Sequence, residues 1–191
     1  AILVSMTVAS SVAQNGSVIR LPRNIRDKFV FIPNANIDIN GQMHATPAFY
    51  MSTYEISNEQ YKVFLDEMKA SGQYTDELMI DTAGWQNIVE YAYNMPYVQF
   101  YHSHEAYKNY PVVNISHKAA QEYCKWLTKK VNADSNDPAW QYEFVLPGRD
   151  LWLAAAQAGD SLAVYSWGNT PIINENGYAM CNFREIGDEY I

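Results

Sequence analysis

The sequence predicts an α+β fold, on the basis of three observations. Short runs rich in aromatic and β-branched residues are bounded by turn signals, as in "FVFIPNANIDING". Three other segments carry apolar residues at helical spacing, two of them directly after a capping residue. Long aromatic loops join these segments, without the regular alternation of strand and helix that a wound parallel sheet requires.

Four segments of the domain are expected to be strands or extended chain. Residues 29–41 are read as a strand that ends in a turn, where Asn40-Gly41 is a strong hairpin signal. Residues 47–57 continue as extended chain, and we expect a short buried strand at 111–113. The segment "YEFVLP", residues 142–147, is expected to be a strand that ends at its proline.

The expected helices have identifiable starts. Ser57 and Gln60 form a capping box, and Gly72 suits the end of that helix. Ser116 caps a second helix, whose apolar stripe is taken as core: Ala120, Tyr123, Cys124, Leu127 and Val131. A third helix is expected between residues 148 and 159. Residues 73–109 show no clean period. The aromatic run from Trp85 to Tyr110 is interpreted as a long, packed, irregular excursion.

Composition limits the classes of partner. The 191 residues suit one domain, and fifteen tyrosines and five tryptophans supply enough bulk for a core. The formal net charge of −8 argues against nucleic acid, because phosphate binding needs clustered Lys and Arg side chains. No nucleic-acid partner is therefore expected.

The N-terminal segment "AILVSMTVASSVAQNGS" has the features of a signal peptide and is treated apart from the domain. Its apolar stretch, residues 2–12, is too short to span a membrane, so no transmembrane helix is expected. Small residues at Ser11 and Ala13 predict signal-peptidase cleavage after Ala13. Residues 1–13 are thus expected to be part of a signal peptide and the protein to be exported (periplasmic, outer-membrane-associated or extracellular). The alternative is a buried N-terminal strand.

After this segment, residues 14–28 are polar and are expected to form an arm or linker. The domain itself is then expected to occupy residues 29–191.

One group of side chains could bind a metal ion, and the two cysteines could form a disulfide. His102 and His104, with Glu105 beside them, have a spacing that metal ligands can use, although no third distant ligand is evident and a plain surface loop is favoured. Cys124 is expected to be a buried free thiol, and a disulfide to Cys181 is the alternative. His44, at an expected turn, and His117, in a first helical turn, are both expected to be solvated.

Four blocks in series carry a family resemblance: "MSTYEISNEQYKVFL", "YPVVNISHKAAQEYCKWL", "LPGRDLWLAAAQAG" and "YSWGN". In order and spacing they resemble the formylglycine-generating enzyme (sulfatase-modifying factor) family, over about residues 29–183. The resemblance implies a variant C-type-lectin-like α+β fold, here expected to be incomplete at its C-terminus. Gly148 and Leu151 depart from the family's Thr and Glu, so the capping box of the third helix is lost.

The resemblance also implies what the family's sites would be. Catalysis there is copper-dependent oxidation by two cysteines near the end of the domain, and soft thiolates suit Cu(I). Neither cysteine of this chain matches that pair, so no catalytic residue is assigned and Cu is expected only where a longer protein supplies the pair. "CNFREIGD" resembles a structural Ca²⁺ segment, which would give Asn182 a side-chain ligand and Phe183 a carbonyl ligand. Glu55 matches a family Glu, and a buried, hydrogen-bonded structural role is expected.

Two functions follow from these observations. The first is a non-catalytic structural or interaction module of the cell envelope, bound to envelope proteins. Similar proteins serve in the gliding and type IX secretion machinery of Bacteroidetes, and the tyrosine-rich stretch from Trp85 to Tyr110 suits an interface. The alternative is a formylglycine-generating oxidase that acts on a cysteine in a sulfatase-like peptide.

Overall fold

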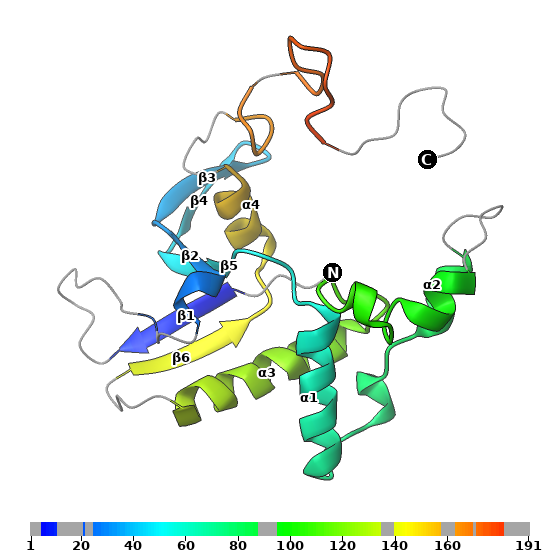
Figure 1. The fold of residues 1–191 in the computed structure, drawn as a ribbon. Helices are drawn as coiled ribbons and strands as arrows, with labels where there is room; N and C mark the ends of the chain where they lie inside the picture. Colours follow the sequence, from blue (N-terminus) through cyan, green and yellow to red (C-terminus); the bar gives the residue numbers. More distant parts are fainter. Residues whose placement is uncertain are drawn as a thin grey trace.

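A four-stranded antiparallel sheet with helices on both faces forms the centre of the molecule (Figure 1). The computed structural model describes residues 5–10, 21, 25–87, 95–134, 140–157, 163–169 and 171–181. Its strands and α-helices are β1 (Ser5–Ser10), β2 (Phe29–Ile32), β3 (Ala35–Ile39), β4 (Gln42–Thr46), β5 (Phe49–Ser52), α1 (Asn58–Ala70), α2 (Met95–Phe100), α3 (His117–Asp134), β6 (Trp140–Val145) and α4 (Arg149–Gln157). The mixture confirms the α+β prediction.

The sheet has the strand order β2-β5-β1-β6, and each neighbouring pair is antiparallel. Strand β1 lies between β5 and β6 and pairs with β6 along its whole length. It falls inside the segment that the sequence assigns to a signal peptide, so residues 5–10 here have the alternative arrangement, a strand. Cleavage after Ala13 stays a prediction.

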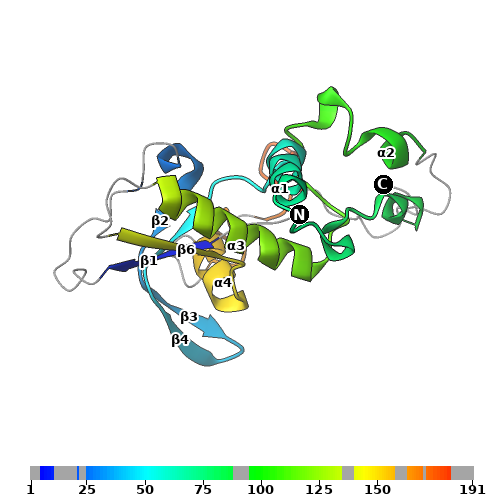
Figure 2. The same cartoon turned by 90° about the horizontal axis from the view of Figure 1, so that it is seen from below.

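Strand β5 separates two hydrophobic clusters. Phe49 and Met51 pack on one face of the sheet with Ile37 and Ala154, between β3 and α4. Tyr50, the residue between them, belongs to the larger cluster on the other face. This alternation follows from the two-residue repeat of a strand. Figures 1 and 2 show α3 along one face of the sheet and α4 beside the β3–β4 hairpin.

The hairpin of β3 and β4 confirms the turn prediction. Asn40 and Gly41 are its two loop residues, with φ of 56° and 83°. Two successive residues with positive φ are typical of a type I′ turn, whose twist matches that of the strands it joins.

Helix α1 begins and ends as the sequence predicts. The Ser57 side chain accepts from the Gln60 backbone N–H at 3.2 Å, and the Gln60 side chain accepts from the Ser57 N–H at 2.8 Å. At the other end, Gly72 has φ of 69°, and its N–H and that of Gln73 donate to the carbonyls of Lys69 and Met68. This double hydrogen bond is a Schellman motif, which requires the left-handed residue that glycine supplies.

Helix α3 is bound to β6 by side-chain hydrogen bonds to the strand's backbone. Asn132 donates to the Tyr142 carbonyl and accepts from the Tyr142 N–H, both at 2.9 Å. One turn earlier, the Thr128 hydroxyl oxygen accepts from the Phe144 N–H at 3.0 Å. The helix is therefore fixed in register on the edge strand of the sheet.

The larger cluster is aromatic where α1 crosses α3. Tyr61 and Phe64 of α1 contact Tyr123 of α3 with ring centroids 5.9 and 5.5 Å apart. The Tyr61 hydroxyl donates to the Leu78 carbonyl at 2.9 Å, so its buried polar atom is satisfied. Burial raises the pKa of Tyr61 well above its usual value, and the nearby Tyr74 adds to the effect.

Three expectations about the ends and connections need correction. Leu21 and Ile25, in the expected linker, are buried in the larger cluster, so this part of the segment belongs to the domain. Residues 111–113 contribute one isolated bridge, between Pro111 and Ser57, and no strand. Residues 73–109 contain short helical segments: α2 and the 3-10 turns η2 (Asp76–Leu78), η3 (Thr82–Asn87) and η4 (Glu105–Tyr107).

Within the described ranges, no helix combines the length and the apolar character needed to cross a bilayer.

Candidate functional site

A cleft of about 640 Å³ lies where the chain enters α3, opposite the start of α4. Its walls come from segments distant in sequence. They are residue 55 before α1, residues 113–117 before and at the start of α3, residues 146 and 147 directly after β6, and residue 152 in α4. Val113, Ile115 and Leu146 contribute apolar lining, and half-exposed Trp152 of α4 contributes an indole. An apolar cleft with few polar groups is the usual form of a small-ligand site.

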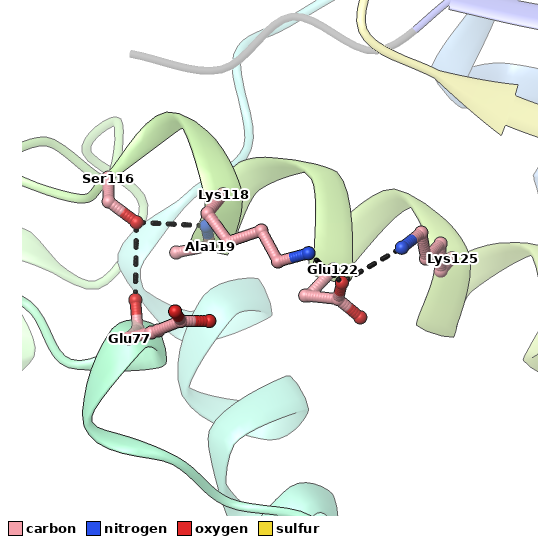
Figure 3. A network of polar contacts seen from close by, with 6 residues as sticks. All are labelled: Glu77, Ser116, Lys118, Ala119, Glu122 and Lys125. Carbon is pink, nitrogen blue, oxygen red and sulfur yellow. Dashed lines mark hydrogen bonds and ion pairs between the residues drawn. The ribbon is translucent and has the colours of Figure 1, made fainter.

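Ser116 lines this cleft at the start of α3. Figure 3 shows its two polar contacts. Its hydroxyl oxygen accepts from the Ala119 N–H at 3.0 Å and donates to the Glu77 carbonyl at 3.2 Å. The first bond is the expected helix cap, and the second joins α3 to η2. Because the hydroxyl hydrogen is held by a carbonyl, Ser116 is not activated as a nucleophile.

Glu55 and Asn114 are the polar groups of the cleft whose bonding is incomplete. Glu55 is exposed and accepts no hydrogen bond from the described residues, so the expectation of a buried structural role is wrong. It follows strand β5 and precedes the cap of α1, outside both hydrophobic clusters. Asn114 has φ of 56°, and its amide nitrogen is buried with no partner in the described part of the chain. A Cβ on Gly84 would lie 3.1 Å from the Asn114 side chain, which packs against it.

A second candidate region is the aromatic excursion, residues 85–110, of which 85–87 and 95–110 are described. We name as the aromatic cluster the five rings that contact one another here: Trp85, Tyr97, Tyr101, Tyr107 and Tyr110. Trp85 stacks on Tyr97 at 5.2 Å and packs on Tyr101 at 4.7 Å; Tyr107 lies 5.4 Å from both Tyr101 and Tyr110. In Figures 1 and 2 this region lies beyond α1, away from the sheet.

Asn58, the first residue of α1, attaches the excursion to the domain. Its amide nitrogen donates to the carbonyls of Tyr101 at 3.0 Å and Tyr107 at 2.9 Å. Its amide oxygen lies 3.0 Å from Nδ1 of His102, and the Trp85 indole N–H donates to Nε2 of His102 at 3.4 Å. Burial lowers the pKa of His102, so the ring is neutral at pH 7. A single buried amide thus holds three points of the excursion.

The outer edge of the aromatic cluster is open to solvent. Tyr97 is 40% exposed and Tyr110 is 53% exposed, and neighbouring Phe100 is 46% exposed, whereas Tyr101 at the centre is buried. Exposed aromatic rings on a fixed backbone are favoured contact residues in protein interfaces.

The histidines of the excursion are engaged in different bonds and do not form a metal site together. His104 Nδ1 accepts from the Ala106 N–H at 3.1 Å and caps η4, while Glu105 pairs with Lys108. That pairing lowers the pKa of Glu105. No group of three or more potential metal ligands occurs in the described ranges. Residues 101–104 form turns, and the strand geometry that would align the two rings is not present.

The remaining predicted residues are scattered. His44 is exposed on β4, not at a turn, and His117 is exposed at the first position of α3, as expected. Cys124 is buried in α3 and Cys181 is part-exposed; both are free thiols, and burial raises the pKa of Cys124 to about 12. The disulfide alternative is therefore not found. Asn182 and Phe183, the expected Ca²⁺ ligands, lie outside the described residues.

Asn58 and Asn114 were missed by sequence reasoning. At this point of the chain the sequence analysis identifies only the Ser57–Gln60 capping box. A signal was available, since the first family block has an asparagine at this position and polar residues buried near a helix start need partners. For Asn114, the sequence offers no comparable signal.

Comparison with known proteins supports the family resemblance. A family model described as a sulfatase-modifying factor enzyme 1-like domain matches residues 18–189, nearly the whole chain. The chain belongs to the sulfatase-modifying factor family. The match begins inside the segment expected to be a linker, in agreement with the burial of Leu21 and Ile25. No curated protein and no solved structure matches the chain. The C-type-lectin-like form of this sulfatase-modifying factor domain stays a prediction.

Proposed function

We propose that this sulfatase-modifying factor domain is exported and acts without catalysis, as an interaction module of the cell envelope. The observation that carries the proposal is the aromatic cluster, whose rings are tied to the start of α1 and whose outer edge is exposed. Rigid tyrosines lose little conformational entropy on binding, so they provide contact area at low cost. The partner is an envelope protein, as for the gliding and type IX secretion proteins of Bacteroidetes that the chain resembles.

Cys124 does not match either cysteine of the family's catalytic pair, and its chemistry is that of a packing residue. Copper oxidation in the family uses thiolates, and a thiol whose pKa is about 12 is protonated at neutral pH. Cys124 is also buried among the aromatic residues of the larger cluster, where its role is packing. Family membership alone is fold-level analogy and a weak warrant for chemistry.

The proposal is tested by cross-linking the full-length protein in its native envelope and identifying stable partners. The double substitution Tyr97→Ser with Tyr110→Ser should weaken partner affinity about tenfold or more, because both exposed rings are lost. Tyr178→Ser, which removes another exposed ring outside the cluster, is the matched control and should bind like the wild type. Absence of any stable partner, or a double variant that binds normally, contradicts the proposal.

Export is tested separately. Mass spectrometry of the mature protein should find Gln14 as its first residue, as cleavage after Ala13 requires. A mature chain that retains residues 5–10 would instead keep β1 in the sheet and would contradict the export proposal.

A second candidate, the formylglycine-generating oxidase, is favoured by the family match. It is tested by incubating the 191-residue chain with Cu(I), O₂ and a cysteine-containing peptide. We expect no peptide oxidation, and turnover would overturn the non-catalytic proposal. A structural Ca²⁺ held in part by Asn182 and Phe183 is proposed from the resemblance alone. It predicts that a chelator lowers the melting temperature of the full-length protein and that added Ca²⁺ restores it.

A further inference from the structure

We propose that His102 is a protonation-sensitive latch that holds the aromatic excursion against α1 and releases it in mildly acidic conditions. The inference rests on the proposed function, because it describes how the same binding surface would be regulated. It depends on the hydrogen-bonding roles of three side chains: Asn58, His102 and Trp85.

The orientation of the Asn58 amide is determined by its neighbours. Its nitrogen faces two carbonyl oxygens, those of Tyr101 at 3.0 Å and Tyr107 at 2.9 Å, and a carbonyl can only accept. The NH₂ group must therefore point at them, and the amide oxygen must be the atom 3.0 Å from Nδ1 of His102.

The protonation state of His102 follows from this orientation. The amide oxygen of Asn58 can only accept, so Nδ1 of His102 carries a hydrogen. The indole N–H of Trp85 can only donate, so Nε2 must have a free lone pair. Only the neutral Nδ1–H tautomer satisfies both bonds. An imidazolium would place a hydrogen on Nε2 facing the Trp85 N–H, and that bond would be lost.

The environment of His102 also favours the neutral ring. Burial lowers the pKa of His102, and no charged group offsets this effect. The Tyr101 ring also packs on the imidazole at 4.9 Å. The titratable or charged groups on the surrounding elements are Glu55, Glu59, Lys62, Asp81, His104 and the Glu105–Lys108 pair. None of them supplies a carboxylate that pairs with a charged His102 in the described part of the chain.

The sign of the pH dependence follows from linkage. The pKa of His102 is lower in the attached state than when the ring is solvated, where it is about 6.5. The attached state is therefore fully favoured above the ordinary histidine pKa and weakens as the pH falls below it. Between that value and the lowered pKa, the ratio of attached to released excursion falls up to about tenfold per pH unit.

Release would rearrange the binding surface. Trp85 stacks on Tyr97, one of the two exposed rings of the aromatic cluster, so loss of the Trp85–His102 bond removes a hydrogen bond that fixes this pair and leaves it held by ring contacts with Tyr101. The imidazolium keeps its Nδ1–H and can still donate to the Asn58 oxygen, so this bond is lost only when the charged ring turns out into solvent and takes the excursion with it. The docking edge would lose its fixed geometry, and a partner would bind less tightly at low pH.

The test is hydrogen–deuterium exchange of the full-length protein from pH 5 to pH 7.5, read as protection factors for residues 97–103. The window stops before η4, because the His104 ring itself caps that turn. For the wild type we expect protection to fall several-fold between pH 6.5 and pH 5. In His102→Gln, which can donate and accept but does not titrate in this range, the profile should be flat. His104→Gln removes an exposed histidine two residues away and should keep the wild-type profile.

If His102→Gln fails to fold, the wild-type His102 titration by NMR gives the answer, with an expected pKa below 6.5. A flat wild-type exchange profile, a His102 pKa at or above 6.5, or a pH dependence abolished by His104→Gln would overturn the latch. These measurements need no partner. A pH-dependent excursion in a protein that cross-links to nothing would support the latch and contradict the binding role.

Discussion

Replacement of Asn58 by alanine should destabilise the domain by about 3 kcal/mol. Three groups lose their partner: the carbonyls of Tyr101 and Tyr107 and the Nδ1–H of His102. A polar group left buried without a partner costs about 1 to 3 kcal/mol. Only the bond to the Tyr101 carbonyl is fully buried, so water can reach the other two groups and the total lies near the lower end of the sum. Alanine is a good helix former, so α1 itself is not weakened.

Urea unfolding followed by far-UV circular dichroism measures this change, with an unchanged m-value as evidence that the unfolding transition is the same. For a domain of this size, the melting temperature should fall by about 6 to 12 °C. Asn109→Ala is the control, because Asn109 is exposed in the same excursion and should change stability by less than about 0.5 kcal/mol. A loss in Asn58→Ala no larger than in the control would refute the role of this amide as the attachment point.

Three further outcomes are expected. Asn132→Ala removes the two hydrogen bonds between Asn132 of α3 and the Tyr142 backbone of β6, and it should lower the free energy of unfolding by about 1 to 2 kcal/mol in the same urea assay. Hydrogen bonds from the Lys130 and Trp126 side chains lower the pKa of Glu67. The ionised Glu67 side chain therefore stabilises the fold above the ordinary glutamate pKa, and this stabilisation is lost as the pH falls through the lowered value. In Glu67→Gln the free energy of unfolding should therefore fall less steeply as the pH is lowered than in the wild type. An unchanged pH dependence would contradict the role of the Glu67 hydrogen bonds. Maleimide labelling of the native protein should modify Cys181 rapidly and Cys124 only in denaturant, because Cys124 is buried and its pKa is raised; equal labelling rates would contradict its burial.

The helix starts and the hairpin could be predicted because their causes are local. The Ser57 capping box and the Ser116 cap each act within three residues, and Asn40-Gly41 sets a turn by the φ angles of two residues. Such signals are present in the sequence whatever the rest of the chain does. The same holds for the apolar stripe of α3, which needs only helical spacing.

The excursion and the candidate sites could not be predicted in the same way. The contact between Asn58 and the Tyr101 carbonyl joins residues 43 positions apart, and no periodicity records it. Glu55 is one residue from buried Ile56, and only the assembled walls of the cleft decide that its side chain faces water. The 3-10 turns between residues 76 and 107 are short and lack an apolar period, so their positions depend on distant contacts.

The division of the core by β5 has a consequence for how this domain can vary. Phe49 and Met51 face α4 while Tyr50 faces α3, so one short strand sets the alignment of both hydrophobic clusters at once. An insertion of one residue before Phe49 would exchange the two faces and place a tyrosine hydroxyl among aliphatic side chains. Insertions of two residues would preserve the faces but shift every pairing with β2. Length changes among relatives should therefore collect in the excursion, outside the stretch from Tyr101 to Tyr107 that Asn58 holds, and be excluded from the four residues of β5.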